Sequence, residues 1–191
     1  MQSKNDLRKE YKLKRRQMDA ASREAMSAKI KLHFLEYLAT HRGIEHIHIF
    51  LPINRLNEIN TWPLIETLLQ QNKSVYTSVS DLKNRDMMTV QLGVDQGLSF
   101  DSYGIPVPAA AHATDESLIQ VVVIPLLAYD LKGQRLGYGM GFYDKFLSRL
   151  PKEVVKAGIS FFPPEEKIPS EPHDVPLDFC IHPQGILVFN Y

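Results

Sequence analysis

The sequence predicts a single three-layer α/β domain with a mainly parallel sheet and an N-terminal pair of helices. Three observations support this fold class: two helical patterns open the chain, strand-like and helical segments then alternate, and one strand-like segment is apolar throughout. Alternation of strands and helices is typical of a sheet that helices cover on both faces. Because 191 residues leave little room for a second core, we expect residues 1–191 to form one domain.

The expected helices lie at residues 4–18, about 22–40, about 62–71 and about 142–150. The first contains neither Pro nor Gly and is strongly basic. In the second, apolar side chains recur at helical spacing, and Gly43 follows its end. Thr61 is expected to cap the third helix, which carries Pro63 in its first turn. The first two helices are expected to pack on the sheet or to extend from it.

The expected strands lie at residues 46–51, 74–79, 87–92, 121–128, 154–160, 179–181 and 186–189. Residues 121–128 read Val-Val-Val-Ile-Pro-Leu-Leu-Ala, and an apolar run of this kind is typical of a strand that is covered on both faces. Residues 99–108 contain Gly104, Pro106 and Pro108 and are expected to form a loop.

Charge and cysteine content narrow the class of protein. Lys plus Arg and Asp plus Glu number 22 each, so net charge favours neither a nucleic-acid nor a membrane partner. The one cysteine, Cys180, forms no internal disulfide and is expected in the core. Because the chain opens with polar residues and contains no long apolar run, we expect no membrane contact and a cytoplasmic location.

The main candidate site links the apolar strand to the fourth helix and reads Asp130-Leu131-Lys132-Gly133-Gln134-Arg135-Leu136-Gly137-Tyr138-Gly139-Met140-Gly141-Phe142-Tyr143-Asp144. Its alternating glycines let the backbone approach a ligand closely, and exposed amides before a helix N-terminus form an anion site. Arg135 supplies a cation for a polyphosphate. Asp144, in the first helical turn, is placed to hold Mg²⁺. The spacing differs from that of a P-loop or a dinucleotide fingerprint.

The first helix carries a run of cations: Lys4, Arg8, Lys9, Lys12, Lys14, Arg15 and Arg16. Such a run is most often a solvated surface, and RNA binding is an alternative. Lys4 and Arg8 lie one helical turn apart and therefore share a face. We expect the remaining cations of this helix to lie on the surface.

The segment from residue 123 to residue 144 closely resembles the 5-formyltetrahydrofolate cyclo-ligase family, also called methenyltetrahydrofolate synthetases. That family carries Gly-x-Arg-Leu-Gly-x-Gly-x-Gly-aromatic-Tyr-Asp after an apolar strand, and residues 133–144 match this motif. Three other segments match in the expected order, so the resemblance covers nearly the whole chain. They are Lys4-x-x-Leu7-Arg8, Phe50-Leu51 followed by Asn57-Glu58-Ile59, and Pro172-His173-Asp174.

The resemblance implies conversion of 5-formyltetrahydrofolate and ATP to 5,10-methenyltetrahydrofolate, ADP and phosphate, with phosphorylation of the formyl oxygen. It implies Arg135 as a catalytic residue and Mg²⁺ at Asp144 and Asp174. The implied folate contacts are Leu51, Glu58, Tyr138 and Phe142. The implied ATP contacts are Lys4, Arg8, Arg135, Leu136, Gly137, Tyr138, Gly139, Met140, Gly141, Phe142 and Tyr143.

Two positions depart from the family motif. The family often has Gly or Lys where Met140 stands and Tyr where Phe142 stands, which can alter affinity without changing the reaction class. The alternative function is a non-catalytic folate- or nucleotide-binding module of the same fold. The joint presence of Arg135, Asp144 and Asp174 favours the enzyme, and we expect it to be a monomer.

Overall fold

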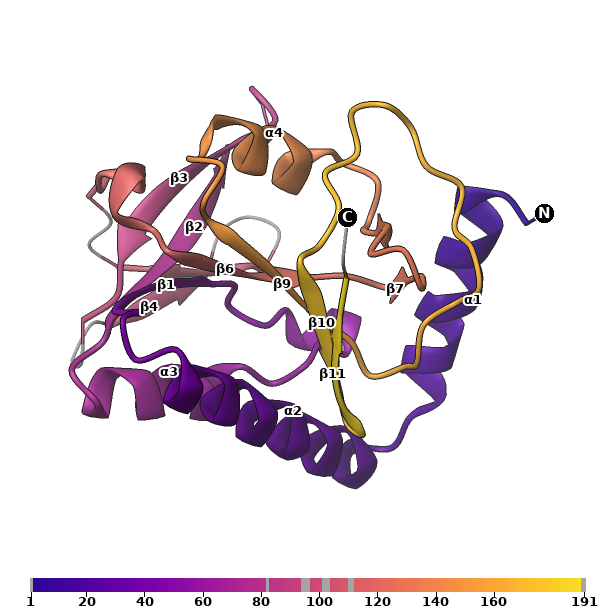
Figure 1. Cartoon of the computed structure of the whole chain (residues 1–191), viewed down its shortest axis with the longest axis horizontal. Coiled ribbons are helices and arrows are strands. Elements are labelled where there is room, and N and C mark those ends of the chain that lie inside the picture. Colours follow the sequence, from indigo (N-terminus) through magenta and orange to yellow (C-terminus); the bar gives the residue numbers. More distant parts are fainter. Residues whose placement is uncertain (1, 82, 94–96, 101–103, 110–111, 190–191) are drawn as a thin grey trace.

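The computed structural model describes residues 2–81, 83–93, 97–100, 104–109 and 112–189. Its central element is a seven-stranded sheet in the order β11-β10-β9-β6-β1-β2-β3 (Figure 1). These strands are β1 His46–Ile49, β2 Ser74–Asp81, β3 Asp86–Gln91, β6 Val121–Pro125, β9 Val155–Ile159, β10 Phe179–His182 and β11 Gly185–Val188. The five inner strands run parallel, and the edge strands β3 and β11 run antiparallel to their neighbours. The predicted mainly parallel sheet is therefore confirmed.

Helices cover both faces of the sheet, which makes three layers (Figure 1). The helices α2 Ala20–Thr40 and α3 Trp62–Gln70 pack on one face, and α4 Phe142–Arg149 packs on the other. Successive residues of β6 point to opposite faces: Val121 and Val123 join the core under α2 and α3, whereas Val122 and Ile124 join the core under α4. This double burial explains the apolar run in the sequence.

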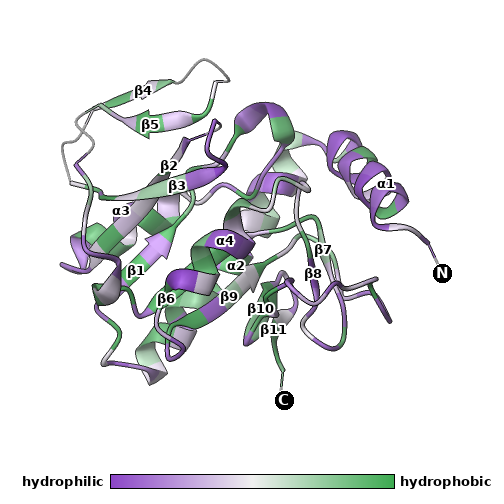
Figure 2. Cartoon of the chain, turned by 90° about the horizontal axis from the view of Figure 1, so that it is seen from above, coloured by the Kyte–Doolittle hydropathy of each residue, from purple (hydrophilic) through white to green (hydrophobic). Residues whose placement is uncertain are grey.

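The two N-terminal helices cover different parts of the molecule. Helix α1 Lys4–Gln17 lies to one side of the sheet and is largely hydrophilic (Figure 2). Its Leu7 and Tyr11 pack on Leu127 and Leu136, in a small core separate from those of the sheet. Among the described residues, no helix is both long and apolar enough to cross a membrane.

Two strand predictions need correction. The expected strand at residues 121–128 is divided, since β6 ends at Pro125 and β7 Ala128–Tyr129 pairs instead with β8 Arg135–Leu136. Proline has no amide hydrogen to continue the sheet ladder, and the apolarity of residues 126–128 reflects burial rather than an unbroken strand. The expected loop at residues 99–108 contains the antiparallel strands β4 Leu98–Phe100 and β5 Pro106–Pro108.

Two single-residue predictions have different outcomes. Cys180 is fully buried in the core under α4, as expected, and burial raises the pKa of its thiol. Thr61 precedes α3, but its hydroxyl does not cap the helix. It donates to the carbonyl of Phe50 at 2.8 Å and so ties the start of α3 to the segment that follows β1.

Candidate active site

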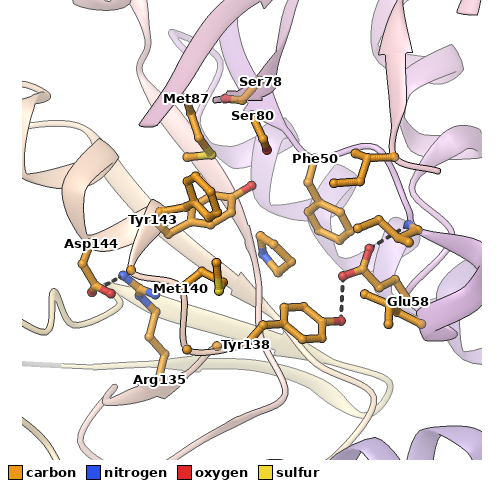
Figure 3. Close-up of a pocket in the computed structure, with 18 of the residues that line it drawn as sticks. Phe50, Glu58, Ser78, Ser80, Met87, Arg135, Tyr138, Met140, Tyr143 and Asp144 are labelled. Atoms are coloured by element: carbon orange, nitrogen blue, oxygen red, sulfur yellow. Dashed lines mark hydrogen bonds and ion pairs between the residues drawn. The ribbon is translucent and has the colours of Figure 1, made fainter. Parts of the chain in front are cut away.

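A cavity of about 590 Å³ opens where the inner parallel strands reach their carboxyl ends (Figure 3). This edge is the usual ligand site of an open α/β sheet. The residues that the resemblance implies as catalytic, substrate-binding or metal-binding all line this one cavity: Lys4, Arg8, Leu51, Glu58, Asp174 and every residue from Arg135 to Asp144. Residues that are 170 positions apart in the sequence therefore meet, as the contact of Lys4 with Asp174 shows.

The lining of the cavity includes two walls that come from different parts of the chain. We call residues 135–144 the loop wall, and Phe50, Ser78, Ser80 and Met87 the strand wall. Figure 3 shows Arg135, Asp144 and Met140 on one side of the cavity and Phe50 and Glu58 on the other, with Ser78, Ser80 and Met87 along a third.

The loop wall has the backbone geometry that its glycines permit. Gly139 and Gly141 have φ values of +94° and +74°, a region that disfavours residues with a Cβ. Gly141 is the N-cap of α4, and among the described residues no side chain caps that helix, so its first amides are left without a side-chain partner next to the cavity. Gly137 does not adopt a positive φ, so only two of the three alternating glycines use that freedom.

Helix α1 contacts the loop wall through Arg8. The Arg8 guanidinium lies 3.1 Å from where a Cβ on Gly139 would stand, and its Nε donates to the Gly137 carbonyl at 3.1 Å. Arg8 Nη1 also donates to Asn5 Oδ1 at 2.8 Å, which orients the guanidinium. The absence of a side chain on Gly139 thus lets a cation approach the loop closely.

Arg135 is a buried cation, only 8% exposed, that lies in β8 at the base of the loop wall. Its Nη2 donates to Asp144 Oδ1 at 2.6 Å, and its Nε donates to the Val175 carbonyl at 3.1 Å. Burial lowers the pKa of Arg135, and the charges of Asp144 and Asp174 oppose that change. An arginine remains protonated in proteins, so this side chain presents a fixed positive charge.

Lys4 and Asp174 form a second charged pair on the same side. Lys4 Nζ lies 2.7 Å from Asp174 Oδ2 and 2.7 Å from Glu171 Oε2. Desolvation lowers the pKa of Lys4, but its hydrogen bonds to the two carboxylates outweigh this effect and the net pKa is raised. Desolvation likewise raises the pKa of Asp174, and the hydrogen bond from Lys4 reverses it, so the net pKa is lowered. Both side chains are therefore charged at neutral pH.

The two carboxylates fit the donor set of a magnesium site. Asp144 accepts from Arg135 and from the Val175 amide through Oδ1, and Asp174 accepts from Lys4 and the Glu171 amide through Oδ2. These bonds use one oxygen of each carboxylate. Mg²⁺ prefers carboxylate oxygens and usually keeps several waters, so one oxygen from each side chain suits it.

Glu58 is a buried carboxylate on the side of the cavity opposite Arg135 (Figure 3). It follows the short helix η1 Asn54–Leu56, where Asn57 takes a left-handed conformation with φ of 50°. Its Oε2 accepts from the Ile53 amide at 2.7 Å, and its Oε1 accepts from the Tyr138 hydroxyl at 2.7 Å. Burial raises the pKa of Glu58, although both hydrogen bonds oppose it.

Arg15 corrects the expectation that the remaining cations of the first helix lie on the surface. It is 3% exposed, and its Nη1 donates to the Tyr138 hydroxyl at 2.7 Å, while its Nη2 donates to the Leu126 carbonyl. Leu7, Tyr11 and Arg15 are the buried residues of α1 and recur every fourth position. The burial of Arg15 could therefore have been predicted from the sequence, because helical spacing puts it on the same face as the apolar Leu7 and Tyr11.

Three residues of the strand wall, Ser78, Ser80 and Met87, were not predicted from the sequence. Ser78 and Ser80 lie on one face of β2, and Met87 stands opposite Ser80 on β3. Behind Ser78, the fully buried His48 of β1 places Nε2 2.7 Å from Ser78 Oγ. Desolvation lowers the pKa of His48 to about 3, so its ring is neutral at physiological pH. The period-two pattern of β2 would have grouped these serines, but only the sheet order brings them to the cavity.

The arrangement combines an anion-binding end with an apolar end. Lys4, Arg8 and Arg135 stand beside the glycine-rich backbone, and Phe50 and Met87 line the other part with the carboxylate of Glu58 nearby. A cavity of this kind can hold a phosphorylated compound next to a flat, largely apolar molecule with polar edges.

The chain is similar in sequence to known proteins over almost its whole length. The chain is 27% identical over 183 residues to a 5-formyltetrahydrofolate cyclo-ligase of Mycoplasma genitalium, covering 95% of this chain and 98% of the relative. It is 28% identical over 181 residues to the enzyme of that name from Haemophilus influenzae, covering 92% and 95%.

Solved structures show the same fold. A 5,10-methenyltetrahydrofolate synthetase of Mycoplasma pneumoniae superposes with a TM-score of 0.78 at 22% identity, covering 95% of this chain and 99% of that chain. The Aquifex aeolicus protein of that name gives a TM-score of 0.83 at 23% identity, covering 98% and 93%. Residues 1–183 match the 5-formyltetrahydrofolate cyclo-ligase family as a whole, and the chain belongs to that family.

Proposed function

We propose that the protein converts 5-formyltetrahydrofolate and ATP to 5,10-methenyltetrahydrofolate, ADP and phosphate. The observation that carries this proposal is a cavity in which the cationic loop wall lies across from Phe50 and the buried carboxylate of Glu58. The relatives named above carry cyclo-ligase or synthetase names, which supports the same reaction.

The chemistry explains why both ends must share one cavity. The formyl group is bound to nitrogen 5 as an amide, so its oxygen is a poor leaving group. Transfer of the γ-phosphoryl group to that oxygen makes it part of a phosphate. Nitrogen 10 then attacks the formyl carbon and gives up its proton, the carbon–oxygen bond breaks, and inorganic phosphate leaves as the ring closes. The protein must align the γ-phosphate with the formyl oxygen and neutralise the developing charge.

The residues of the cavity divide between the two substrates. ATP would contact Lys4, Arg8, Arg135, Leu136, Gly137, Tyr138, Gly139, Met140, Gly141, Phe142 and Tyr143, the last several through backbone amides. The folate would contact Leu51, Glu58, Tyr138 and Phe142. Arg135, whose charge is buried and held by Asp144, is the catalytic cation. Its fixed position means that little reorganisation is needed when charge develops on the phosphoryl group.

Asp144 and Asp174 would hold Mg²⁺. Bound there, the metal would neutralise charge on the phosphates of ATP. The residues themselves orient the nucleotide: Arg135 is fixed by Asp144, and Lys4 is fixed by Asp174.

We further infer that residues 1–191 form one domain, which the family match over residues 1–183 supports. The monomeric state, the cytoplasmic location and the absence of nucleic-acid and membrane partners stay predictions. The burial of Arg15 and the inward contacts of Lys4 and Arg8 argue against RNA binding, because they remove these cations from the outer face of α1.

The test is a turnover assay with the purified protein, Mg²⁺, ATP and 5-formyltetrahydrofolate. We expect the near-ultraviolet absorbance of the methenyl product to appear, and to require all three additions. If calorimetry detects binding of either substrate but neither ADP nor methenyl product forms across pH and metal conditions, the non-catalytic binding module is the correct function.

A further inference from the structure

A buried chain of three polar side chains crosses the floor of the cavity from α1. Arg15 Nη1 donates to the Tyr138 hydroxyl at 2.7 Å, and that hydroxyl donates to Glu58 Oε1 at 2.7 Å (Figure 3 shows the second bond). Tyr138 and Glu58 line the cavity, whereas Arg15 lies behind them. The chain thus joins the first helix to the loop wall and then to the opposite side of the cavity.

The direction of each hydrogen bond follows from the chemistry of the groups. A guanidinium carries only donors, so the Tyr138 oxygen must accept from Arg15. The one phenolic proton of Tyr138 is then directed to Glu58 Oε1. The Ile53 amide donates to the other oxygen, Oε2. Both oxygens of Glu58 therefore act as acceptors, which is the pattern of an ionised carboxylate.

Burial acts against this ionised form. Desolvation raises the pKa of Glu58. Within the described part of the chain, the ionisable side chains that interact with it are Arg15 from α1, Tyr138 from the loop wall and Tyr143 from α4. Burial also raises the pKa of both tyrosines, so they stay neutral at physiological pH. Arg15 is the cation of this group, and its effect on Glu58 is strengthened by the low polarity around it.

Arg15 is also held in place independently of Tyr138. Its Nη2 donates to the Leu126 carbonyl, and its own carbonyl accepts from Asn57 Nδ2 at 3.1 Å, one residue before Glu58. Arg23 Nη1 donates to Asn57 Oδ1 at 2.8 Å and fixes that amide from α2. The guanidinium is therefore positioned by its surroundings, and it can impose an orientation on Tyr138.

We propose that Arg15 is a positioning residue: it fixes the Tyr138 hydroxyl as a donor to Glu58 and so holds Glu58 as a carboxylate that accepts hydrogen bonds from the bound ligand. The proposal rests on the proposed function only in naming that ligand as the folate. Arg15 touches neither substrate in this account and acts through Tyr138.

The direct test is the titration of Glu58 in the ligand-free protein, followed by ¹³C NMR of labelled glutamate carboxyl groups. The Glu58→Gln variant assigns the signal. We expect Arg15→Met to raise the pH at which Glu58 titrates by about one unit or more. Arg15→Lys keeps a charge and a donor, so it should raise the titration pH of Glu58 by less than Arg15→Met does. Arg16→Met is the matched control, because Arg16 is exposed on the same helix, and it should leave the titration unchanged.

A second arm separates a positioning role from that of a distant charge. In a Tyr138→Phe background the hydroxyl that links Arg15 to Glu58 is absent. If Arg15 acts through Tyr138, the effect of Arg15→Met on the Glu58 titration should largely disappear in that background. An effect of undiminished size would overturn the positioning role. If Arg15→Met does not fold, the same cycle is made with Arg15→Lys.

The main kinetic consequence is expected in folate binding. At neutral pH we expect Arg15→Met to raise the KM for 5-formyltetrahydrofolate by about tenfold with a smaller change in kcat, since a larger fraction of Glu58 would be protonated. The difference should narrow as pH rises and Glu58 ionises in both proteins. An unchanged Glu58 titration in Arg15→Met contradicts the inference. A wild-type protein without turnover contradicts only the proposed function, because the NMR titration needs no substrate.

Discussion

The two walls of the cavity are built from the sequence in opposite ways. The loop wall comes from ten consecutive residues, and its cation and backbone amides are local features of that segment. The strand wall is assembled from three separate segments: Phe50 follows β1, Ser78 and Ser80 belong to β2, and Met87 belongs to β3. A contiguous wall can carry a recognisable motif, whereas an assembled wall depends on sheet order and register. We therefore expect loop-wall changes to act on turnover and strand-wall changes to act mainly on stability.

Arg135→Ala tests the loop wall with the largest expected effect. Removing a fixed charge next to the transferred phosphoryl group should lower kcat by about a thousandfold. Asp144 would also lose its buried partner, so the unfolding temperature should fall. Arg135→Lys keeps the charge and separates the two effects: its stability should be closer to that of the wild type while turnover stays impaired. Full activity in the alanine variant would remove Arg135 from the mechanism.

Ser78→Ala tests the strand wall. It removes the hydroxyl at 2.7 Å from His48 Nε2, and the other ring nitrogen, Nδ1, has no partner among the described residues. A buried polar group without a partner should lower the free energy of unfolding by about 1–3 kcal/mol, measured by denaturant titration. Turnover should change far less than in Arg135→Lys. Ser80→Ala, on the same face of β2, is the control, and an equal stability loss there would refute the role of His48.

Gly139→Ala returns to the loop wall with a smaller effect. The added Cβ would stand 3.1 Å from the Arg8 guanidinium at a backbone φ of +94°. The strain should raise the free energy of the native loop conformation by roughly 1–2 kcal/mol. The KM for ATP should rise by about tenfold as a result. Gly43→Ala is the matched control, since a Cβ there meets nothing within 4 Å. Equal KM values for the two variants would mean that the close approach of Arg8 is irrelevant to ATP.

His48 predicts a pH dependence of stability on the strand-wall side. In the unfolded chain its pKa is near 6.5, and in the folded protein desolvation lowers it to about 3. Between these values the unfolded state binds the proton and the folded state does not. The free energy of unfolding should therefore fall as pH falls through this window, by at most about 1.4 kcal/mol per pH unit. His48→Phe should show a flatter dependence in the same range, and an identical slope would contradict the assignment.

Patterns within one segment predicted the fold class and the loop wall. The apolar run at residues 121–128 identified the centre of the sheet because both faces of β6 are buried. It misplaced the end of that strand, since apolarity reports burial and not hydrogen bonding between strands. The glycine-rich run was predictable for a similar reason: the positive φ values of Gly139 and Gly141 are properties of the local backbone.

Contacts between segments that are distant in the sequence could not be predicted from patterns within one segment. The partner of Arg15 is Tyr138, 123 positions away, so its burial could be inferred from helical spacing but its contact could not. His48 and Ser78 meet only because β1 and β2 are parallel neighbours. The resemblance supplied Glu58 and Asp174 in advance, because a family motif records which distant segments converge.

The most direct test of the shared cavity follows the formyl oxygen itself. The wild-type protein is given ATP, Mg²⁺ and 5-formyltetrahydrofolate labelled with ¹⁸O in the formyl group, and the released phosphate is analysed by mass spectrometry. If the cavity aligns the γ-phosphate with the formyl oxygen, one ¹⁸O atom should appear in each phosphate, in a one-to-one ratio with the methenyl product. Methenyl product accompanied by unlabelled phosphate would contradict this account.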